Sequence, residues 1–372
     1  MEKNSKIYVA GHTGLVGSAL TDTLMSKGYT NLLLRTIGEL DLTDQRLTEQ
    51  FFAEEKPDYV FLAAARVGGI VANNTLRADF IYQNLMIQNN IIHSSWKHGV
   101  KKLLFLGSTC IYPGNAPQPL KEDYLLTSQL EYTNEPYAVA KIAGLKMCES
   151  FNIQYNTNFI AVMPTNLYGH GDNYDLERSH VLPALLRKFH LGKALEDENW
   201  QSIRNDLDKN PIKNTDGKSD KETILSVLSK YGISAEETGK PSGKKVSVTL
   251  WGTGSPLREF MNSRDMAEAC VFVMENVNVK DIIAIHRSGK SEENYHPPHF
   301  INIGTGEEIS IKDLAFKIKA LTGFTGKIVF DHSKPDGTMR KTTDITALRG
   351  LGYNHRISLE EGLKITYDKY RK

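Results

Sequence analysis

The sequence of 372 residues has few cysteines and no excess of charge of either sign. Its three cysteines, Cys110, Cys148 and Cys270, are odd in number and far apart in the chain. This argues against a disulfide framework and favours a reducing compartment. The formal net charge is only +1, which gives no support to a nucleic-acid-binding surface.

Long hydrophobic runs are also missing. No apolar stretch approaches the roughly 20 residues that a membrane-spanning helix requires, and MEKNSKIYVAG enters a strand-like run without a signal-peptide-like region. We interpret Asp281–Pro298 as a loop insertion. The three histidines in this region, His286, His296 and His299, lack the spacing of metal ligands. We therefore expect a cytoplasmic protein with no metal site that contacts neither membrane nor nucleic acid.

The first half of the chain alternates short apolar runs with longer helix-like segments. Ala78–His98 and Tyr137–Tyr155 have lengths that suit crossover helices. The predicted strands are bounded by glycine, proline or polar residues and are Lys6–Ala10, Asn31–Arg35, Tyr59–Ala63, Lys102–Leu106 and Asn158–Met163. This repeated βαβ pattern predicts an α/β fold with a doubly wound parallel sheet of the Rossmann type.

The chain is longer than one hydrophobic core usually supports, so we expect two domains. Residues 1–165 are predicted to bind the dinucleotide. Residues 166–372 are predicted to form mainly a smaller substrate-binding lobe, with one or two returns to the first sheet. Residues 193–245 are polar and rich in turn formers, and we interpret them as a surface insertion with one short helix in TILSVLSKYG. A regulatory or partner-binding role for this insertion is the alternative.

A glycine-rich turn follows the first predicted strand. Gly11, Gly14 and Gly17 permit a tight turn and the approach of a diphosphate, whose charge the amides at the start of the next helix can hold. A strand before the turn and a helix after it are typical of a dinucleotide site. The second strand is followed by Arg35-Thr36, where an acidic residue would select NAD, so a cation at this position favours NADP.

Three residues suggest carbonyl reduction. Ser108 follows a strand end, and Tyr137 and Lys141 share one face of a helix at positions i and i+4. We predict that the lysine ammonium lowers the pKa of the Tyr137 phenol. Tyr137 can then protonate a carbonyl oxygen as a hydride reaches its carbon, while Ser108 donates a hydrogen bond to the same oxygen.

Eight stretches that cover most of the chain, without the two predicted insertions, are AGHTGLVGSAL, LAAARVGGIVANNTLRADFIYQN, LFLGSTCIYP, NEPYAVAKIAGLKMCE, MPTNLYGHGDNY, SHVLPALLRKFH, WGTGSPLREF and SKPDGTMRK. Together they resemble the extended short-chain dehydrogenase/reductases, and more narrowly the GDP-L-fucose synthases. The resemblance implies conversion of GDP-4-keto-6-deoxy-D-mannose to GDP-L-fucose, by epimerisation at C3 and C5 and NADPH-dependent reduction at C4. It also implies a homodimer packed through Ala78–His98 and Tyr137–Tyr155.

The same resemblance implies roles for further residues. Cys110 and His180 are expected to exchange the C3 and C5 protons, because a thiol and an imidazole both exchange protons near neutral pH. The residues expected to bind the GDP-sugar are Asn166, Lys188, Trp251, Arg258 and Asp336. The residues expected to contact NADP(H) are Gly11, His12, Thr13, Gly14, Leu15, Val16, Gly17, Arg35, Asp41, Leu42, Ala64, Leu106, Gly107, Lys141, Pro164, Asn166, Leu167 and His180. Thr13 and Ile37 stand where members of this family can carry arginines, which weakens the preference for NADP over NAD.

Two other functions remain open at this point. One is another nucleotide-sugar enzyme of this fold, a 4-epimerase or 4,6-dehydratase that retains NAD. Cys110 stands where a dehydratase needs an acid/base carboxylate. The other is a non-catalytic dinucleotide-binding module that uses residues 193–245 as a partner surface. The set of Ser108, Tyr137 and Lys141 argues against such a module.

Overall fold

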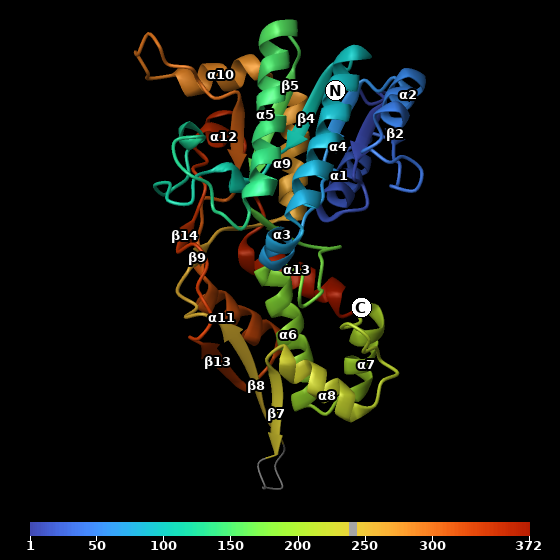
Figure 1. The fold of residues 1–372 in the computed structure, drawn as a ribbon, viewed down its shortest axis with the longest axis vertical. Coiled ribbons are helices and arrows are strands. Elements are labelled where there is room, and N and C mark those ends of the chain that lie inside the picture. The colour runs from blue at the N-terminus through green and yellow to red at the C-terminus, as the bar shows by residue number, and fades with distance from the viewer. Residues whose placement is uncertain (238–243) are drawn as a thin grey trace. The chain divides into compact units, whose positions relative to one another are not determined.

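The computed structural model describes residues 1–237 and 244–372, and these residues form two compact units (Figure 1). The first unit comprises residues 1–171, 259–307 and 341–359, and the second comprises residues 172–258, 308–340 and 360–372. Residues 238–243 of the predicted insertion lie outside the described residues. Among the described helices, none combines the length and the apolar character needed to cross a membrane.

In the described residues, the first unit is built on a six-stranded parallel sheet, which confirms the predicted fold class. In spatial order the strands are β11 (Phe300–Ile303), β5 (Phe159–Pro164), β4 (Lys102–Leu106), β3 (Tyr59–Leu62), β1 (Ile7–Ala10) and β2 (Leu32–Leu33). The chain moves outward from β1 in both directions, so the winding reverses between β1 and β3. Ligands of such sheets bind beyond the carboxyl ends of the strands at this reversal.

Helices cover both faces of this sheet. Successive strand residues point to opposite faces, so Ile7 and Val9 pack in one core while Tyr8 and Ala10 pack in the other. The core around Ile7 includes residues of α1 (Leu15–Ser26) and α9 (Ser263–Asn276). The helices of the opposite core are α2 (Gln45–Glu55), α4 (Arg77–Lys97) and α5 (Glu135–Tyr155). Burial on both faces explains why these strands read as continuous apolar runs in the sequence.

The remaining elements of the first unit are short, apart from one helix that the sequence analysis missed. They are α3 (Ile70–Thr75), η1 (Thr109–Ile111), η2 (Glu122–Tyr124), β6 (Asn166–Tyr168), β10 (Phe260–Asn262), α10 (Val279–Arg287) and α12 (Thr346–Gly350). The prediction of a loop over Asp281–Pro298 is wrong for its first part, which is the end of α10. This helix forms because Asp281 accepts a hydrogen bond from the Asn278 N–H at 2.8 Å and because Ile282 is buried.

The second unit combines helices with small sheets. Its helices are α6 (Val181–Glu196), α7 (Trp200–Lys209), α8 (Lys221–Lys230), α11 (Ile311–Thr322) and, from residue 360 on, α13 (Leu359–Tyr370). In one sheet, β8 (Lys244–Trp251) pairs in parallel with β13 (Lys327–Asp331) and antiparallel with β7 (Ile233–Glu237). Elsewhere β9 (Leu257–Arg258) pairs antiparallel with β12 (Ile309–Ser310). Of the two residues of β14 (Arg340–Lys341), Arg340 belongs to the second unit and Lys341 to the first.

Residues 193–245 contain more regular structure than the sequence predicted. They supply the last turn of α6, both α7 and α8, and the edge strand β7, where a surface insertion with one helix was expected. The difference arises because each helix buries two apolar side chains: Ile203 and Leu207 in α7, Ile224 and Leu228 in α8. The segment therefore contributes these apolar side chains to the second unit's core, while most of its described residues stay at least partly exposed.

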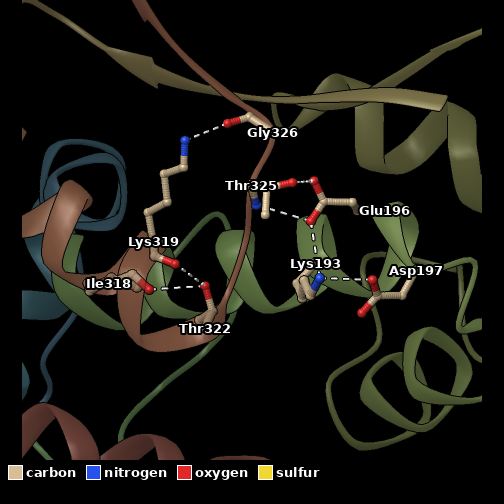
Figure 2. A network of polar contacts seen from close by, with 8 residues as sticks. All are labelled: Lys193, Glu196, Asp197, Ile318, Lys319, Thr322, Thr325 and Gly326. Atoms are coloured by element: carbon tan, nitrogen blue, oxygen red, sulfur yellow. Dashed lines mark hydrogen bonds and ion pairs between the residues drawn. The ribbon is translucent and has the colours of Figure 1, made fainter. Parts of the chain in front are cut away.

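The beginning of this segment is fixed by polar contacts between α6 and the chain that leads into β13 (Figure 2). The Glu196 carboxylate accepts hydrogen bonds from the backbone N–H of Thr325, at 3.0 Å, and from its hydroxyl. Lys193 pairs with Glu196 at 3.3 Å and with Asp197 at 2.8 Å. Nearby, Lys319 of α11 donates to the Gly326 carbonyl at 2.6 Å. These contacts hold α6 and α11 against β13.

Candidate active site

The glycine-rich turn lies at the carboxyl end of β1. Gly11 has φ +83°, and a Cβ there would lie 2.7 Å from the backbone of Ala64, just after β3, so the turn tolerates only glycine. A Cβ on Gly17 would lie 2.0 Å from the Gly11 carbonyl oxygen. The nearest described atom to a Cβ on Gly14 is the same oxygen, at 3.6 Å, which is an ordinary contact. The turn therefore packs tightly at Gly11 and Gly17 but leaves room at Gly14, the N-cap of α1.

This geometry fits a dinucleotide diphosphate. The amides at the start of α1 point away from the helix and can donate to an anion. Gly14 presents no side chain that would keep a phosphate from the backbone. His12, Thr13, Leu15 and Val16 complete the turn, and Thr13 is exposed.

Alanine substitutions can separate these two roles of glycine. Gly14→Ala should keep the melting temperature of the parent, because its φ of −80° suits alanine and its Cβ meets no tight contact. Its affinity for NADP(H) should fall by about tenfold or more, because the methyl group occupies the approach of the diphosphate. Gly17→Ala should lose both stability and affinity. Differential scanning calorimetry and a fluorescence titration of NADPH measure the two effects, and unchanged affinity in Gly14→Ala would exclude this turn as the diphosphate site.

The predicted NADP-selecting cation, Arg35, lies just beyond β2. Its guanidinium forms an ion pair with Glu55 at 2.8 Å and lies 5.7 Å from the centroid of the Phe51 ring. The side chain is 34% exposed, so it is anchored to α2 and still accessible to solvent. Ile37 is 82% exposed. The Arg35 side chain is thus a cation that is held in place at the end of β2.

The other residues expected around the cofactor in the first unit lie at strand ends or in the loop before α2. The Asp41 carboxylate accepts hydrogen bonds from the N–H and hydroxyl of Thr43, and the Leu42 carbonyl accepts one from Asn90. Leu106 ends β4 and Gly107 follows it, Pro164 ends β5, and Asn166 and Leu167 are the first two residues of β6. The Asn166 side chain donates to the Glu259 carbonyl at 2.8 Å. A Cβ on Gly107 would lie 2.3 Å from the Met163 sulfur, so a larger residue there would require the Met163 side chain to shift.

Ser108, Tyr137 and Lys141 lie together at the carboxyl end of β4. Ser108 caps η1, and its hydroxyl is hydrogen-bonded to the Tyr137 side chain. The Lys141 ammonium lies 5.8 Å from the centroid of the Tyr137 ring, which confirms that both side chains share one face of α5. Lys141 is 3% exposed and donates to the Leu106 carbonyl at 2.8 Å. The structure therefore brings the three predicted residues together.

Burial dominates the protonation of this group. Desolvation of the Tyr137 phenol raises its pKa, with a smaller contribution from Cys110 in the same direction, while the hydrogen bond with Ser108 opposes the shift. Desolvation also lowers the pKa of Lys141 to about 7. The prediction that Lys141 lowers the pKa of Tyr137 is wrong for this structure, because burial of the phenol dominates and raises its pKa. The phenol therefore keeps its proton at neutral pH.

Cys110 lies on the same turn as Ser108. Its backbone N–H donates to the Ser108 hydroxyl at 3.2 Å, and its side chain is partly exposed. The ammonium of Lys341 donates to its sulfur at 3.6 Å. Sequence reasoning missed Lys341, which ends the stretch SKPDGTMRK and is separated from Cys110 by 231 residues. No spacing rule relates residues so far apart.

His180 belongs to the second unit, where it is the exposed N-cap residue of α6. Since Cys110 belongs to the first unit, the pairing of these two side chains stays a prediction. Lys188 lies two turns further along α6, is half-buried and donates to the Thr249 carbonyl at 3.3 Å. Its burial lowers the pKa of its ammonium to about 8.

The remaining expected substrate residues are neighbours within the second unit. Trp251 ends β8 and is 65% exposed. Two residues later, Thr253 donates from its N–H and hydroxyl to the Asp336 carboxylate, at 2.9 and 2.7 Å. These hydrogen bonds lower the pKa of Asp336, with a smaller contribution from the Arg258 charge. Arg258 is half-buried, and burial lowers its pKa. An exposed indole and cations from Lys188 and Arg258 suit a nucleoside diphosphate.

Each unit thus carries a distinct kind of chemistry. The first unit holds a glycine turn for a dinucleotide, a proton donor in Tyr137 and a thiol in Cys110. The second holds cations and an exposed aromatic ring. Among the described residues, no group of three or more histidine, cysteine or acidic side chains has an arrangement suited to a metal ion.

Comparison with protein families identifies one match. Residues 7–208 and 216–285 match the NAD dependent epimerase/dehydratase family. This match spans most of the chain, including the glycine turn and the Ser–Tyr–Lys group.

Similar proteins extend over the whole chain. A putative GDP-L-fucose synthase 2 of Arabidopsis thaliana is 48% identical over 370 residues, which are 100% of this chain and 93% of the relative. The GDP-L-fucose synthase of Escherichia coli K12 is 46% identical over 363 residues, which are 97% of this chain and 95% of the relative. A solved GDP-mannoheptose C4 reductase from Campylobacter jejuni, with NADP bound, is 44% identical with a TM-score of 0.83 and covers 100% of both chains.

Proposed function

The chain belongs to the NAD dependent epimerase/dehydratase family, and from this premise we propose that it makes GDP-L-fucose from GDP-4-keto-6-deoxy-D-mannose. It is an NADP-dependent enzyme that epimerises C3 and C5 of the sugar and reduces the C4 ketone. The observation that carries the proposal is the placement of Cys110 on the same turn as Ser108, beside Tyr137 and Lys141. A reductase needs only the last three residues, and the thiol adds a group that can exchange protons.

The first unit would hold NADP(H). The diphosphate would lie over Gly14 at the start of α1, Arg35 would pair with the 2′-phosphate, and Lys141 would contact the nicotinamide ribose. Bound NADPH supplies a hydride to C4 of the sugar. Most of the other residues expected around the cofactor follow the ends of β1, β3, β4 and β5 and so lie along one edge of the sheet. Asp41 and Leu42 lie in the loop before α2, and His180 belongs to the second unit.

In the reduction, Tyr137 would act as the acid. Its phenol O–H gives a proton to the C4 oxygen as the carbonyl carbon becomes tetrahedral, and Ser108 donates a hydrogen bond to that oxygen. The raised pKa of Tyr137 keeps the proton available until the oxygen becomes basic. This transfer leaves a phenolate on Tyr137. When Lys141, on the same face of α5, carries its proton, its positive charge stabilises that phenolate.

In the epimerisation, Cys110 and His180 would share the proton transfers. The C4 ketone acidifies the hydrogens on C3 and C5, because the electron pair of a broken C–H bond moves onto the C4 oxygen. One of the two side chains takes the proton, and the other returns a proton to the opposite face of the same carbon. Ser108 and Tyr137 stabilise the negative charge on the oxygen in this step as in the reduction.

The GDP part of the substrate would bind residues of the second unit. Lys188 and Arg258 supply positive charge for the diphosphate, and Trp251 offers an exposed ring beside it. Asp336 is held by Thr253 and would accept hydrogen bonds from a ribose or sugar hydroxyl. Asn166, from the first unit, would contact the sugar.

The direct test is incubation of the protein with GDP-4-keto-6-deoxy-D-mannose and NADPH. We expect NADPH oxidation and a product with inverted C3 and C5 centres, identified by NMR. Cofactor binding without oxidation of NADPH would rule out the proposed reaction.

A second candidate function is C4 reduction of a GDP-keto-sugar without epimerisation. It is favoured by the similarity to the GDP-mannoheptose C4 reductase, whose name mentions reduction only. The same NMR experiment distinguishes the two functions, because a reductase alone leaves C3 and C5 unchanged and takes up no deuterium there from D2O.

We further propose a homodimer in the cytoplasm. The helices α4 and α5 pack on each other and leave large apolar side chains on their surface: Tyr82 is 63% exposed and Ile153 is 70% exposed. Burial of these side chains between two copies would account for their exposure in one chain. The three free cysteines support a reducing compartment. Sedimentation equilibrium tests the dimer.

A further inference from the structure

Lys341 lies against the thiol proposed for proton transfer. Its ammonium donates to the Cys110 sulfur at 3.6 Å, although the two residues come from β14 and η1. Both residues belong to the first unit. A positive charge at this distance favours a negative charge on the sulfur even in a water-like dielectric. The contact therefore places a cation directly beside the sulfur.

The backbone that carries Lys341 is fixed on one side by a buried carboxylate. Glu259 is 0% exposed and accepts hydrogen bonds from the N–H and the hydroxyl of Thr343, both at 2.7 Å. The same carboxylate accepts from the N–H groups of Thr305 and Gly306. Glu259 therefore joins the end of β11 to the segment that follows Lys341.

The same segment is fixed on its other side by the loop before η2. The Leu120 N–H donates to the Thr342 carbonyl at 2.7 Å, and the Asp344 N–H donates to the Leu120 carbonyl at 2.8 Å. The Thr342 N–H donates to the Gln118 side chain at 2.9 Å. Lys341 is half-buried and directly precedes these hydrogen-bonded residues. Its place beside Cys110 is thus set by the fold, unlike that of a surface lysine.

The thiol is fixed as well. The Cys110 N–H donates to the Ser108 hydroxyl, and Ser108 is hydrogen-bonded to Tyr137. A negative charge on the sulfur disfavours the Tyr137 phenolate. An anionic sulfur at Cys110 and a phenolate at Tyr137 would therefore repel each other, and a cation beside the sulfur offsets this repulsion.

We propose that Lys341 is a positioning residue for Cys110, holding the sulfur in place and stabilising its anionic form. The consequence for catalysis rests on the proposed function: when the sulfur takes a proton from C3 or C5, an S–H bond forms as the C–H bond breaks, and the electron pair moves to the C4 oxygen. Lys341 keeps its own proton throughout. It sets the charge around the thiol and exchanges nothing with the sugar.

The first test needs no substrate. Cys148 and Cys270 are 1% and 0% exposed, so iodoacetamide should alkylate Cys110 selectively in the folded protein, as peptide mapping can verify. At pH 7 we expect Lys341→Gln to be alkylated about five- to tenfold more slowly than the parent, the effect of one unit charge at this distance. Lys341→Arg should restore the rate. Lys121→Gln, a change of an exposed lysine on the neighbouring loop, should react like the parent.

The second test measures uptake of deuterium from D2O at C3 and C5 of the keto-sugar without NADPH. Uptake should fall in Lys341→Gln in proportion to the alkylation rate and recover in Lys341→Arg. If Lys341→Gln has a lower melting temperature than the parent, both measurements are repeated with Lys341→Met, which removes the charge but keeps the aliphatic part of the side chain. Alkylation of both neutral variants at the parent rate would overturn the proposal. Failure of the parent to take up deuterium would instead contradict the proposed epimerisation while leaving the alkylation result valid.

Discussion

Tyr137→Phe should lower the rate of NADPH-dependent reduction by about 10²- to 10⁴-fold, the usual effect of losing a general acid. The hydroxyl is the proposed proton source. It is hydrogen-bonded to Ser108, and burial keeps it protonated at neutral pH. Phenylalanine keeps the ring and removes only the O–H. The measurement is the initial rate of NADPH oxidation with the keto-sugar, together with a titration of NADPH binding.

Binding of NADPH should survive this substitution, because the proposed diphosphate site lies at the separate turn around Gly14. A matched control is Tyr132→Phe, which removes the same hydroxyl from a residue that is 69% exposed. That variant should reduce the substrate at the parent rate. If Tyr137→Phe were as active as the parent, another group would have to protonate the C4 oxygen. A protein that bound NADPH but showed no activity in either form would fit the non-catalytic module.

Cys110→Ser should slow epimerisation by about 10²- to 10⁴-fold and leave the chemistry of reduction intact. A serine hydroxyl fits the space of the thiol but does not become anionic near neutral pH, so it cannot take the C3 or C5 proton. Deuterium uptake at these carbons, followed by NMR without NADPH, measures the epimerisation. NADPH oxidation, measured separately with the keto-sugar already epimerised at C3 and C5, reports on the reduction.

Cys148→Ala is the control for loss of a thiol elsewhere in the first unit. This residue is buried in α5 among apolar side chains, so the variant should lose some stability and keep both activities. Equal loss of epimerisation and reduction in Cys110→Ser would contradict the division of labour between the thiol and Tyr137. It would indicate that Cys110 is needed to shape the turn at Ser108 instead.

Much of the fold could be predicted from local patterns. The five strands expected in the first half all occur, and β4 has the bounds that the apolar run predicted. The edge strand β2 is shorter, Leu32–Leu33 instead of Asn31–Arg35, because only one neighbour pairs with it. In residues 193–245 the helix expected in TILSVLSKYG occurs as α8. The helix α7 was missed, since it buries only Ile203 and Leu207 in a mostly polar segment.

The sequence alone determined the chemistry that depends on neighbouring residues. A glycine turn after a strand, a serine at a strand end and a tyrosine four residues before a lysine are local features, because turns, strand ends and helix faces each involve only a few consecutive residues. The structure brings Ser108, Tyr137 and Lys141 together as these patterns indicated.

Only the tertiary structure decided the electrostatics of the group. Desolvation depends on every element packed around a side chain, and it reversed the expected direction of the Tyr137 pKa. The contact of Lys341 with Cys110 arises from Glu259 and Leu120, which fix a distant segment beside the turn. Such contacts are invisible in the sequence, because they depend on how the chain returns to the sheet.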